Sequence, residues 1–284
     1  MACSDKKPSP APTKEPPRAV DPAAEDSTPQ SFEDKCKAGD LEACRQRGVE
    51  LSASKVETER AEATALFEKA CTGGNASACS NLALNYVAGT GVEANSAKAY
   101  ELFEKACAGG HGLGCRNAGL ARLNGDGVEQ DPAGARERFG KGCELGAALS
   151  CTNFAMALRD GVGGDKKMDD AVQTFIRACD QGDAAACRHL GAMYATGEGL
   201  PPGRESAAVW FERACAGKDR QGCTALGVIL LDGGSEDERE AAKGALGRGC
   251  DLGDMGACEL MVKEGWVEKT VEILPLGDAG TRAP

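Results

Sequence analysis

The sequence predicts an all-α protein, an α/α superhelical solenoid of about seven disulfide-linked helix pairs. Three observations support this class: a constant repeat length, two cysteines in every copy, and an aromatic residue at a fixed place before them. The first cysteines of successive copies are 35 or 36 residues apart. A constant period of this size is typical of stacked repeat arrays and not of an enzyme domain with a single core.

The cysteines occur in pairs that are eight positions apart, as in CELGAALSC at residues 143–151. Fourteen of the fifteen cysteines belong to such pairs, so one pattern explains nearly all of them. The pairs are Cys36 and Cys44, Cys71 and Cys79, Cys107 and Cys115, Cys143 and Cys151, Cys179 and Cys187, Cys215 and Cys223, and Cys250 and Cys258.

The residues before each pair predict an amphipathic helix, which we call helix B. A small residue stands eight positions before the first cysteine and an aromatic residue four positions before it, so that these residues and the cysteine share one helical stripe. The aromatic column comprises Phe32, Phe67, Phe103, Phe139, Phe175 and Phe211, with Leu246 in the last copy; the small column comprises Ala63, Ala99, Ala135, Ala171, Ala207 and Ala242. We expect helix B to bury its aromatic residue one turn before the cysteine.

The residues after each pair predict a second helix, helix A. Apolar or small residues follow the second cysteine at the third, fourth and seventh positions, as in Leu82, Ala83 and Tyr86. Glycine or alanine at the fourth position would let a neighbouring helix approach closely. Helix A is expected to end at a glycine, because a left-handed C-terminal cap favours this residue. These glycines are Gly89, Gly125, Gly161, Gly197 and Gly233.

The seven residues between paired cysteines predict a disulfide and not a metal site. Zinc sites usually have roughly two to four residues between cysteines, often with histidine, and only His111 and His189 are present here. A tight turn from helix B into the next helix A would bring the two α-carbons within the roughly 4.4–6.8 Å that a disulfide needs. Seven such bridges imply an oxidising compartment, so we expect an exported protein: in the bacterial periplasm, on the outer membrane as a lipoprotein, or secreted. No metal and no cofactor is predicted.

The composition excludes two kinds of partner. The net charge of −11 argues against binding to nucleic acid and against electrostatic binding to anionic lipid. No stretch of about 18 apolar residues occurs, so no transmembrane segment is predicted.

The two ends of the chain differ from the repeats. Residues 1–30 contain seven prolines without apolar periodicity and are expected to be a disordered tether. Cys3 follows no hydrophobic segment, and we expect it to match the lipidated first residue of a mature bacterial lipoprotein; an unmodified thiol is the alternative. The solenoid is expected to span residues 31–265. Residues 266–284, with Trp266, Val267, Val271, Ile273 and Leu274, are expected to cap its last helix, a partner-binding tail being the alternative.

A 36-residue helical repeat with G-x-G-V in its loop, K-A-C at the end of helix B and A-C in the next helix A resembles the Sel1-like repeat, a relative of the tetratricopeptide repeat. The C-x7-C pair in every copy is similar to the secreted cysteine-rich proteins of the Hcp type. The resemblance covers residues 31–265, and it implies an α/α superhelix that acts as an interaction scaffold. Some Hcp-type members are associated with β-lactam binding or weak β-lactamase activity, which implies an enzymatic alternative.

Polar residues of helix A predict a binding surface for a peptide or protein partner. In a stacked array they would form a row on the concave face, where asparagine offers a donor and an acceptor to a peptide backbone and arginine can bind a carboxylate. The candidates are Asn81, Asn85, Asn117, Asn124, Asn153, Arg116, Arg188 and His189. An ordinary solvated polar face is the alternative.

No catalytic residue is predicted. Serine β-lactamases combine S-x-x-K with S-D-N and K-T-G. Ser52 with Lys55, and Ser4 with Lys7, have the first spacing, but neither of the other two motifs occurs in the sequence. A β-lactam or peptidoglycan-binding hydrolase is therefore the alternative function and not the first one.

Overall fold

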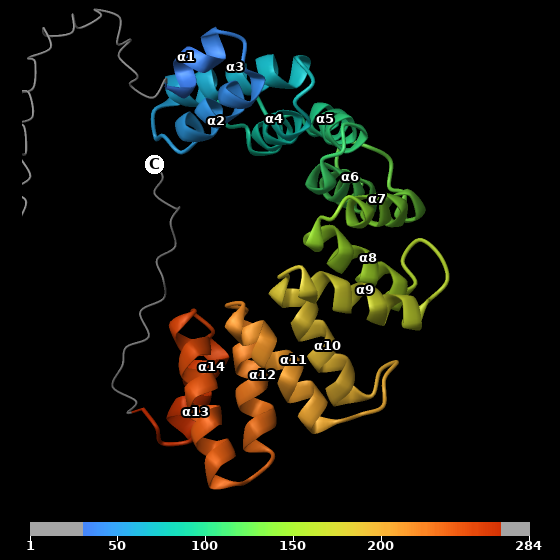
Figure 1. Ribbon diagram of the computed structural model, residues 1–284, viewed down its shortest axis with the longest axis vertical. Helices are drawn as coiled ribbons and strands as arrows, with labels where there is room; N and C mark the ends of the chain where they lie inside the picture. The colour runs from blue at the N-terminus through green and yellow to red at the C-terminus, as the bar shows by residue number, and fades with distance from the viewer. Residues whose placement is uncertain (1–30, 268–284) are drawn as a thin grey trace, which may run out of the picture.

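The computed structural model describes residues 31–267, and these residues form α-helices without any β-strand. The helices are arranged as an arc, with the first and the last helices on the same side of the molecule (Figure 1). Their bounds are α1 Phe32–Lys37, α2 Leu41–Ser52, α3 Glu57–Thr72, α4 Ala76–Ala88, α5 Ser96–Ala108, α6 Gly112–Asn124, α7 Pro132–Glu144, α8 Ala148–Asp160, α9 Met168–Asp180, α10 Ala184–Thr196, α11 Arg204–Ala216, α12 Arg220–Leu231, α13 Glu236–Asp251 and α14 Met255–Lys263. The predicted fold class is confirmed: the odd-numbered helices are the predicted helices B and the even-numbered ones are the helices A.

Each odd-numbered helix is joined to the next even-numbered helix by one disulfide, and all seven predicted pairs are bonded. The Cα–Cα distances lie between 4.4 Å and 4.9 Å, within the range for disulfides. The turn between the two helices needs a left-handed residue, which is glycine in six of the seven turns; Gly146, for example, has φ 82°. In the sixth turn, however, Lys218 adopts this conformation with φ 64°.

The core is the predicted column of aromatic and small residues. Phe67, Phe139 and Phe175 are at most 2% exposed, and the alanines four residues before them are fully buried. Glycine on the even-numbered helix makes room for the rings of Phe67, Phe139 and Phe211: a Cβ on Gly119 would lie 2.6 Å from Cε1 of Phe139. Only Phe32 is exposed, at 38%, because α1 begins the described array and no helix covers its outer side.

The even-numbered helices form the inner layer of the arc and the odd-numbered helices the outer layer. Contacts between neighbouring repeats are more extensive in the inner layer, where they join α4 to α6, α6 to α8, α10 to α12 and α12 to α14, than in the outer layer, where they join α11 to α13. Helices on the inside of a curved double layer are closer together than those on the outside. The even-numbered helices contact one another more, and they are therefore the inner layer. In Figure 1, α6 accordingly lies on the hollow side of α7, and α14 on the hollow side of α13.

The predicted glycine caps are confirmed at four helices and wrong at the fifth. Gly89, Gly125, Gly161 and Gly197 have the left-handed conformation directly after α4, α6, α8 and α10. The prediction for Gly233 is wrong, since α12 ends with right-handed Asp232 and the positive φ of 76° falls on Gly234. The reason is a shorter loop, in which Ser235 and Glu238 already form the capping box of α13.

Most even-numbered helices begin with a side-chain cap that the sequence analysis did not use. Asp40, Asn75, His111, Asp183, Asp219 and Asp254 each accept a hydrogen bond from a backbone N–H of the following turn. This satisfies donors at the helix start that have no partner within the helix. The position lies four residues before the second cysteine, so it fixes the start of each helix A.

Candidate functional site

Four residues of the predicted polar row lie on the inner layer, at the same position of four successive even-numbered helices. Asn81, Asn117, Asn153 and His189 stand two residues after the second cysteine of α4, α6, α8 and α10, and each is partly exposed. The structure brings two of them together through Arg116. The Nε of Arg116 donates to Oδ1 of Asn153 at 3.1 Å, and its Nη1 donates to Oδ1 of Asn117 at 3.4 Å.

Arg116 differs from the two other arginines that occupy the same position of helix A. Arg45 forms an ion pair with Glu42, and Arg188 forms one with Asp219 at 3.2 Å. Arg116 is half-buried, and no carboxylate within residues 31–267 forms an ion pair with it. Burial lowers the pKa of the Arg116 guanidinium, and the more distant Asp183 offsets this in part.

Asn85 and Asn124 are not part of this row, although Asn124 lines the same groove as Asn117. Asn85 is only 8% exposed, and its amide donates to Oγ1 of Thr64 at 2.8 Å, so it joins α4 to α3 inside the repeat. Asn124 ends α6, where its amide donates to Asp126 at 3.2 Å. The predicted residues that hydrogen bonds bring together are therefore Arg116, Asn117 and Asn153, on α6 and α8.

His189 is held beside the aromatic column. Its ring stacks on Phe175 with centroids 5.2 Å apart. Burial, together with the nearby Arg188 and Arg159, lowers the pKa of His189 to about 4. The imidazole is therefore neutral at pH 7, and it adds no positive charge to the inner layer.

An apolar groove lies beside Arg116, Asn117 and Asn153, which we call the Arg116 cluster. It has a volume of about 380 Å³ and lies between α4 and α6, with α5 behind. Leu84 and Val87 line one side of it and are 48% and 57% exposed, while Leu120 and Asn117 line the other. Asn117 thus belongs both to the groove and to the Arg116 cluster.

The sequence analysis missed these apolar residues. Leu84 and Leu120 stand five positions after the second cysteine, and this position is also apolar in Val49, Met156 and Val228. The recurrence was a usable signal. The recurrence does not show whether these apolar residues are exposed, because apolar residues at helical spacing are more often part of a core.

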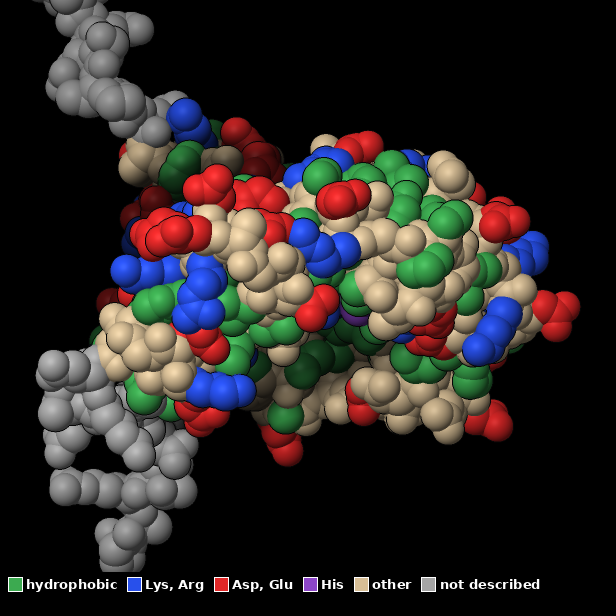
Figure 2. Space-filling model, turned by 90° about the horizontal axis from the view of Figure 1, so that it is seen from below, with side chains coloured by type: hydrophobic (Ala, Val, Ile, Leu, Met, Phe, Trp, Pro, Cys, Tyr) green, Lys and Arg blue, Asp and Glu red, His purple; other side chains and the backbone are tan. Residues whose placement is uncertain are grey.

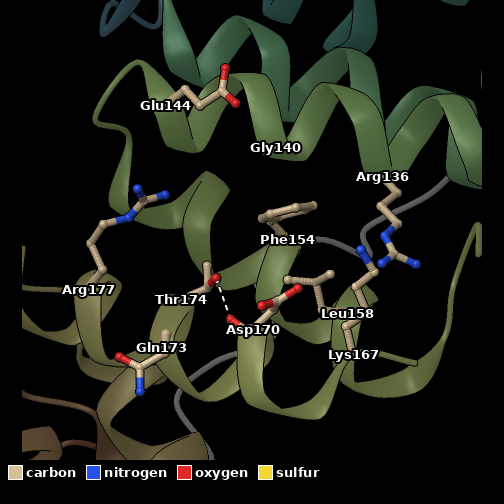
Figure 3. Close-up of a pocket in the computed structure, with 10 residues that line it drawn as sticks. All are labelled: Arg136, Gly140, Glu144, Phe154, Leu158, Lys167, Asp170, Gln173, Thr174 and Arg177. Atoms are coloured by element: carbon tan, nitrogen blue, oxygen red, sulfur yellow. Dashed lines mark hydrogen bonds between the residues drawn. The ribbon is translucent and has the colours of Figure 1, made fainter. Parts of the chain in front are cut away.

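A second hollow, of about 580 Å³, lies in the outer layer between α7 and α9 (Figure 3). Phe154 and Leu158 of α8 form its floor, and Figure 3 shows the ring of Phe154 between the two helices. Its two arginines already have partners in the chain: Arg136 donates to the carbonyl of Asp165 at 2.9 Å, and Arg177 contacts the sulfur of Cys143.

The surface has no large area of a single charge in the view of Figure 2. Acidic and basic side chains alternate there, and a histidine is visible in the hollowed centre. Within residues 31–267 no group of three or more His, Cys, Asp or Glu side chains could hold a metal ion. None of the described helices is long and apolar enough to cross a membrane.

The serine of the S-x-x-K match has a structural partner. Ser52 is the last residue of α2, and its hydroxyl donates to the carbonyl of Val49 at 2.8 Å. Lys55 follows in the connecting loop and is exposed. Ser4, Lys7 and Cys3 lie outside the described residues, as do Val271, Ile273 and Leu274, so the predicted lipidation stays a prediction and so does most of the predicted cap.

Fold and surface together define a class: an α/α solenoid whose successive helix pairs are joined by disulfides and whose inner layer carries the polar row. Five consecutive segments match the Sel1 repeat, at residues 42–75, 76–111, 113–146, 148–183 and 184–219. These segments cover more than half of the chain, which therefore belongs to the Sel1 repeat family. It is a helical scaffold of a kind that typically serves protein–protein interaction.

Solved structures with the same fold include a protective antigen present in uropathogenic Escherichia coli strains. It is 22% identical over 83% of this chain with a TM-score of 0.70, and this chain spans about half of it, 52%. A Sel1 repeat protein from Oxalobacter formigenes is 24% identical over 74% of this chain and 84% of its own, with a TM-score of 0.64. Cysteine rich protein B of Helicobacter pylori is 29% identical over 47% of this chain and 96% of its own, with a TM-score of 0.40. No curated protein matches the chain in sequence.

Proposed function

We propose that this protein is an exported helical-repeat scaffold that binds a peptide or protein partner on the inner layer, across α4, α6 and α8. The observation that supports this most directly is the junction of Arg116, Asn117 and Asn153 with the apolar groove. Seven disulfides support export, because such bonds persist in oxidising compartments. Residence in the periplasm or on the outer membrane is part of the same proposal.

The polar half of this surface has unused hydrogen-bonding capacity. The side-chain oxygens of Asn117 and Asn153 accept from Arg116, while neither amide nitrogen donates to another group within residues 31–267. Two fixed N–H donors that point from neighbouring helices suit the carbonyl oxygens of an extended peptide. Because the oxygens are already engaged, the two amides are also held in one orientation.

The apolar half provides the complementary contact. Leu84, Val87 and Leu120 form the sides of a groove large enough for one aliphatic or aromatic side chain. Burying such a side chain contributes about 1.5–3 kcal/mol, more than one neutral hydrogen bond does. We therefore infer that the groove provides much of the affinity and that the amides set the direction of the bound peptide.

The test is a titration of the partner captured from the native cell envelope against variants of the full chain. N117A together with N153A should weaken binding by several-fold to about a hundredfold, because each lost neutral hydrogen bond is worth about 0.5–1.5 kcal/mol. Q173A, in the outer-layer hollow, is the control and should leave affinity unchanged. Circular dichroism of each variant checks the fold. The opposite pattern, with only Q173A weakening binding, would contradict the proposal.

A further inference from the structure

We propose that Arg116, Asn117 and Asn153 bind the C-terminal carboxylate of a peptide whose last residue is aliphatic and occupies the groove between α4 and α6. This inference rests on the proposed function and names the chemical class of its partner.

The first step is the contrast between equivalent arginines. Arg45, Arg116 and Arg188 all follow the second cysteine of their helices directly. Arg45 and Arg188 are neutralised by Glu42 and Asp219, and Arg116 meets only two neutral amide oxygens. A partly desolvated guanidinium without a counter-ion binds a carboxylate more strongly than one that already has a carboxylate partner, since no existing ion pair must be broken.

The second step is the number of donors that are left. A guanidinium has five N–H groups, and the two hydrogen bonds of Arg116 use Nε and one hydrogen of Nη1. The other hydrogens can form a two-point contact with the oxygens of one carboxylate. The amide nitrogens of Asn117 and Asn153 stand beside it as further donors.

The third step is the neighbouring groove, which decides which carboxylate fits. Asn117 touches Arg116 on one side and lines the apolar groove on the other. A C-terminal leucine has a carboxylate and an aliphatic side chain on the same residue, so it reaches both places at once. An internal aspartate or glutamate has its negative charge on its own side chain and would need a second residue for the groove. The net charge of −11 also disfavours partners with several carboxylates.

The experiment uses the full, oxidised chain and three synthetic probes: acetyl-Ala-Ala-Leu with a free carboxylate, the same peptide as an amide, and acetyl-Ala-Asp-Leu-amide. Titration is followed by calorimetry and by the side-chain N–H signals of arginine and asparagine in NMR spectra. We expect the free acid to bind about ten- to a hundredfold more tightly than the amide, because the lost contact is a charge-assisted hydrogen bond. Its affinity should fall as salt is added.

Two variants identify the residue. R116Q should remove the preference for the free acid, whereas R188Q, which changes an arginine already paired with Asp219, should keep it. R116K checks that any loss follows from the guanidinium and not from misfolding: it should keep the thermal melting temperature and retain part of the preference.

The inference is overturned if the amide binds as tightly as the acid, if the free acid shows no saturable binding, if R116Q keeps the preference, or if the internal aspartate peptide binds best. The proposed function would survive any of these results, since the captured partner would still depend on Asn117 and Asn153. Loss of that dependence would instead reject the proposed function itself.

Discussion

Lys218 occupies a backbone conformation that glycine occupies in the other six turns between disulfide-bonded helices. A left-handed conformation brings Cβ of an ordinary residue too close to the following carbonyl, and the strain is about 1–2 kcal/mol. Within residues 31–267, the Lys218 side chain forms no hydrogen bond or ion pair that would require lysine here. The strain at Lys218 is therefore a local weakness of the sixth helix pair.

We predict that K218G stabilises the protein by about 0.5–1 kcal/mol, less than the strain because glycine is also more flexible in the unfolded chain. The matched control is G182K in the preceding turn, where φ is 93° and no atom lies within 4 Å of the place of a Cβ. That change should destabilise the protein by a similar amount. Denaturant midpoints measure both, and a loss of stability in K218G would show that its side chain has a role not seen in the turn.

His189 makes stability depend on pH. Its folded-state pKa of about 4 lies below the ordinary value of 6.5, so between these values the unfolded chain binds more protons than the folded one. The free energy of unfolding therefore falls as the pH is lowered from 6.5 to 4, by up to about 1.4 kcal/mol per pH unit. Burial also lowers the pKa of His111, which acts in the same direction. Glu42, with a pKa of about 2, loses its contribution only as the pH falls from 4.5 through 2.

H189N introduces the residue that three other repeats have at this position, and it should reduce the loss of stability between pH 7 and pH 5. Unfolding by denaturant at both pH values is the measurement. The loss of unfolding free energy that remains in H189N should come from His111. If H189N and the natural chain lose the same free energy, His189 is not the group that titrates.

At the scale of the helix pair, the buried aromatic residue is the main apolar anchor. Phe139 is 2% exposed and Phe32 is 38% exposed, although both stand four residues before a cysteine. F139A should therefore destabilise the protein by about 3–5 kcal/mol, because it leaves a cavity between α6 and α7. F32A should have a much smaller effect. Equal losses in thermal or denaturant unfolding would contradict the stacked arrangement.

The helix pair was also the level at which sequence reasoning worked best. The columns that contain Phe139, Ala135 and Gly119 recur with a constant period, so their burial could be predicted from periodicity alone. The ends were harder: Gly233 was mispredicted because the capping box of Ser235 and Glu238 shortens that loop, and this depends on a local hydrogen bond.

The candidate site was predictable only in part, for a different reason. The positions of Asn117, Asn153 and Arg116 on helix A followed from the repeat. The repeat does not show which of the three arginines lacks a counter-ion. Glu42 lies three residues before Arg45 in the same helix, whereas Asp219 lies in the next repeat after Arg188, so the two ion pairs share no sequence spacing. The exposure of Leu84 and Val87 was equally hard to predict, since it depends on how neighbouring helix pairs stack.

For the whole molecule, the disulfides hold each pair together covalently, while neighbouring pairs interact through packing, hydrogen bonds and ion pairs such as Arg138 with Glu104. A disulfide between cysteines eight positions apart stabilises the folded state by about 2.5 kcal/mol, because it restricts the unfolded chain. C143A with C151A removes a bridge from the middle of the array, and C36A with C44A removes one from its start. We predict that the first change destabilises the array and that the second mainly releases α1.

Hydrogen exchange distinguishes these two outcomes. Loss of the Cys36–Cys44 bridge should increase exchange in α1 and the start of α2, and leave α6 to α10 protected. Loss of the Cys143–Cys151 bridge should increase exchange across α7 and α8 and in the helices beside them. A uniform increase along the chain in both variants would show that the array unfolds as one unit and does not depend on local bridges.

The central claim is that the inner layer is the surface that binds a partner. The most direct measurement is photo-cross-linking in the native host, with a photoreactive phenylalanine analogue in place of Leu120 on the inner layer or of Val209 on the outer layer, where the side chain is 60% exposed. We predict a discrete cross-linked protein from position 120, lost when N117A and N153A are added, and none from position 209. A product from position 209 alone, or a product from position 120 that ignores the two alanine substitutions, would contradict it.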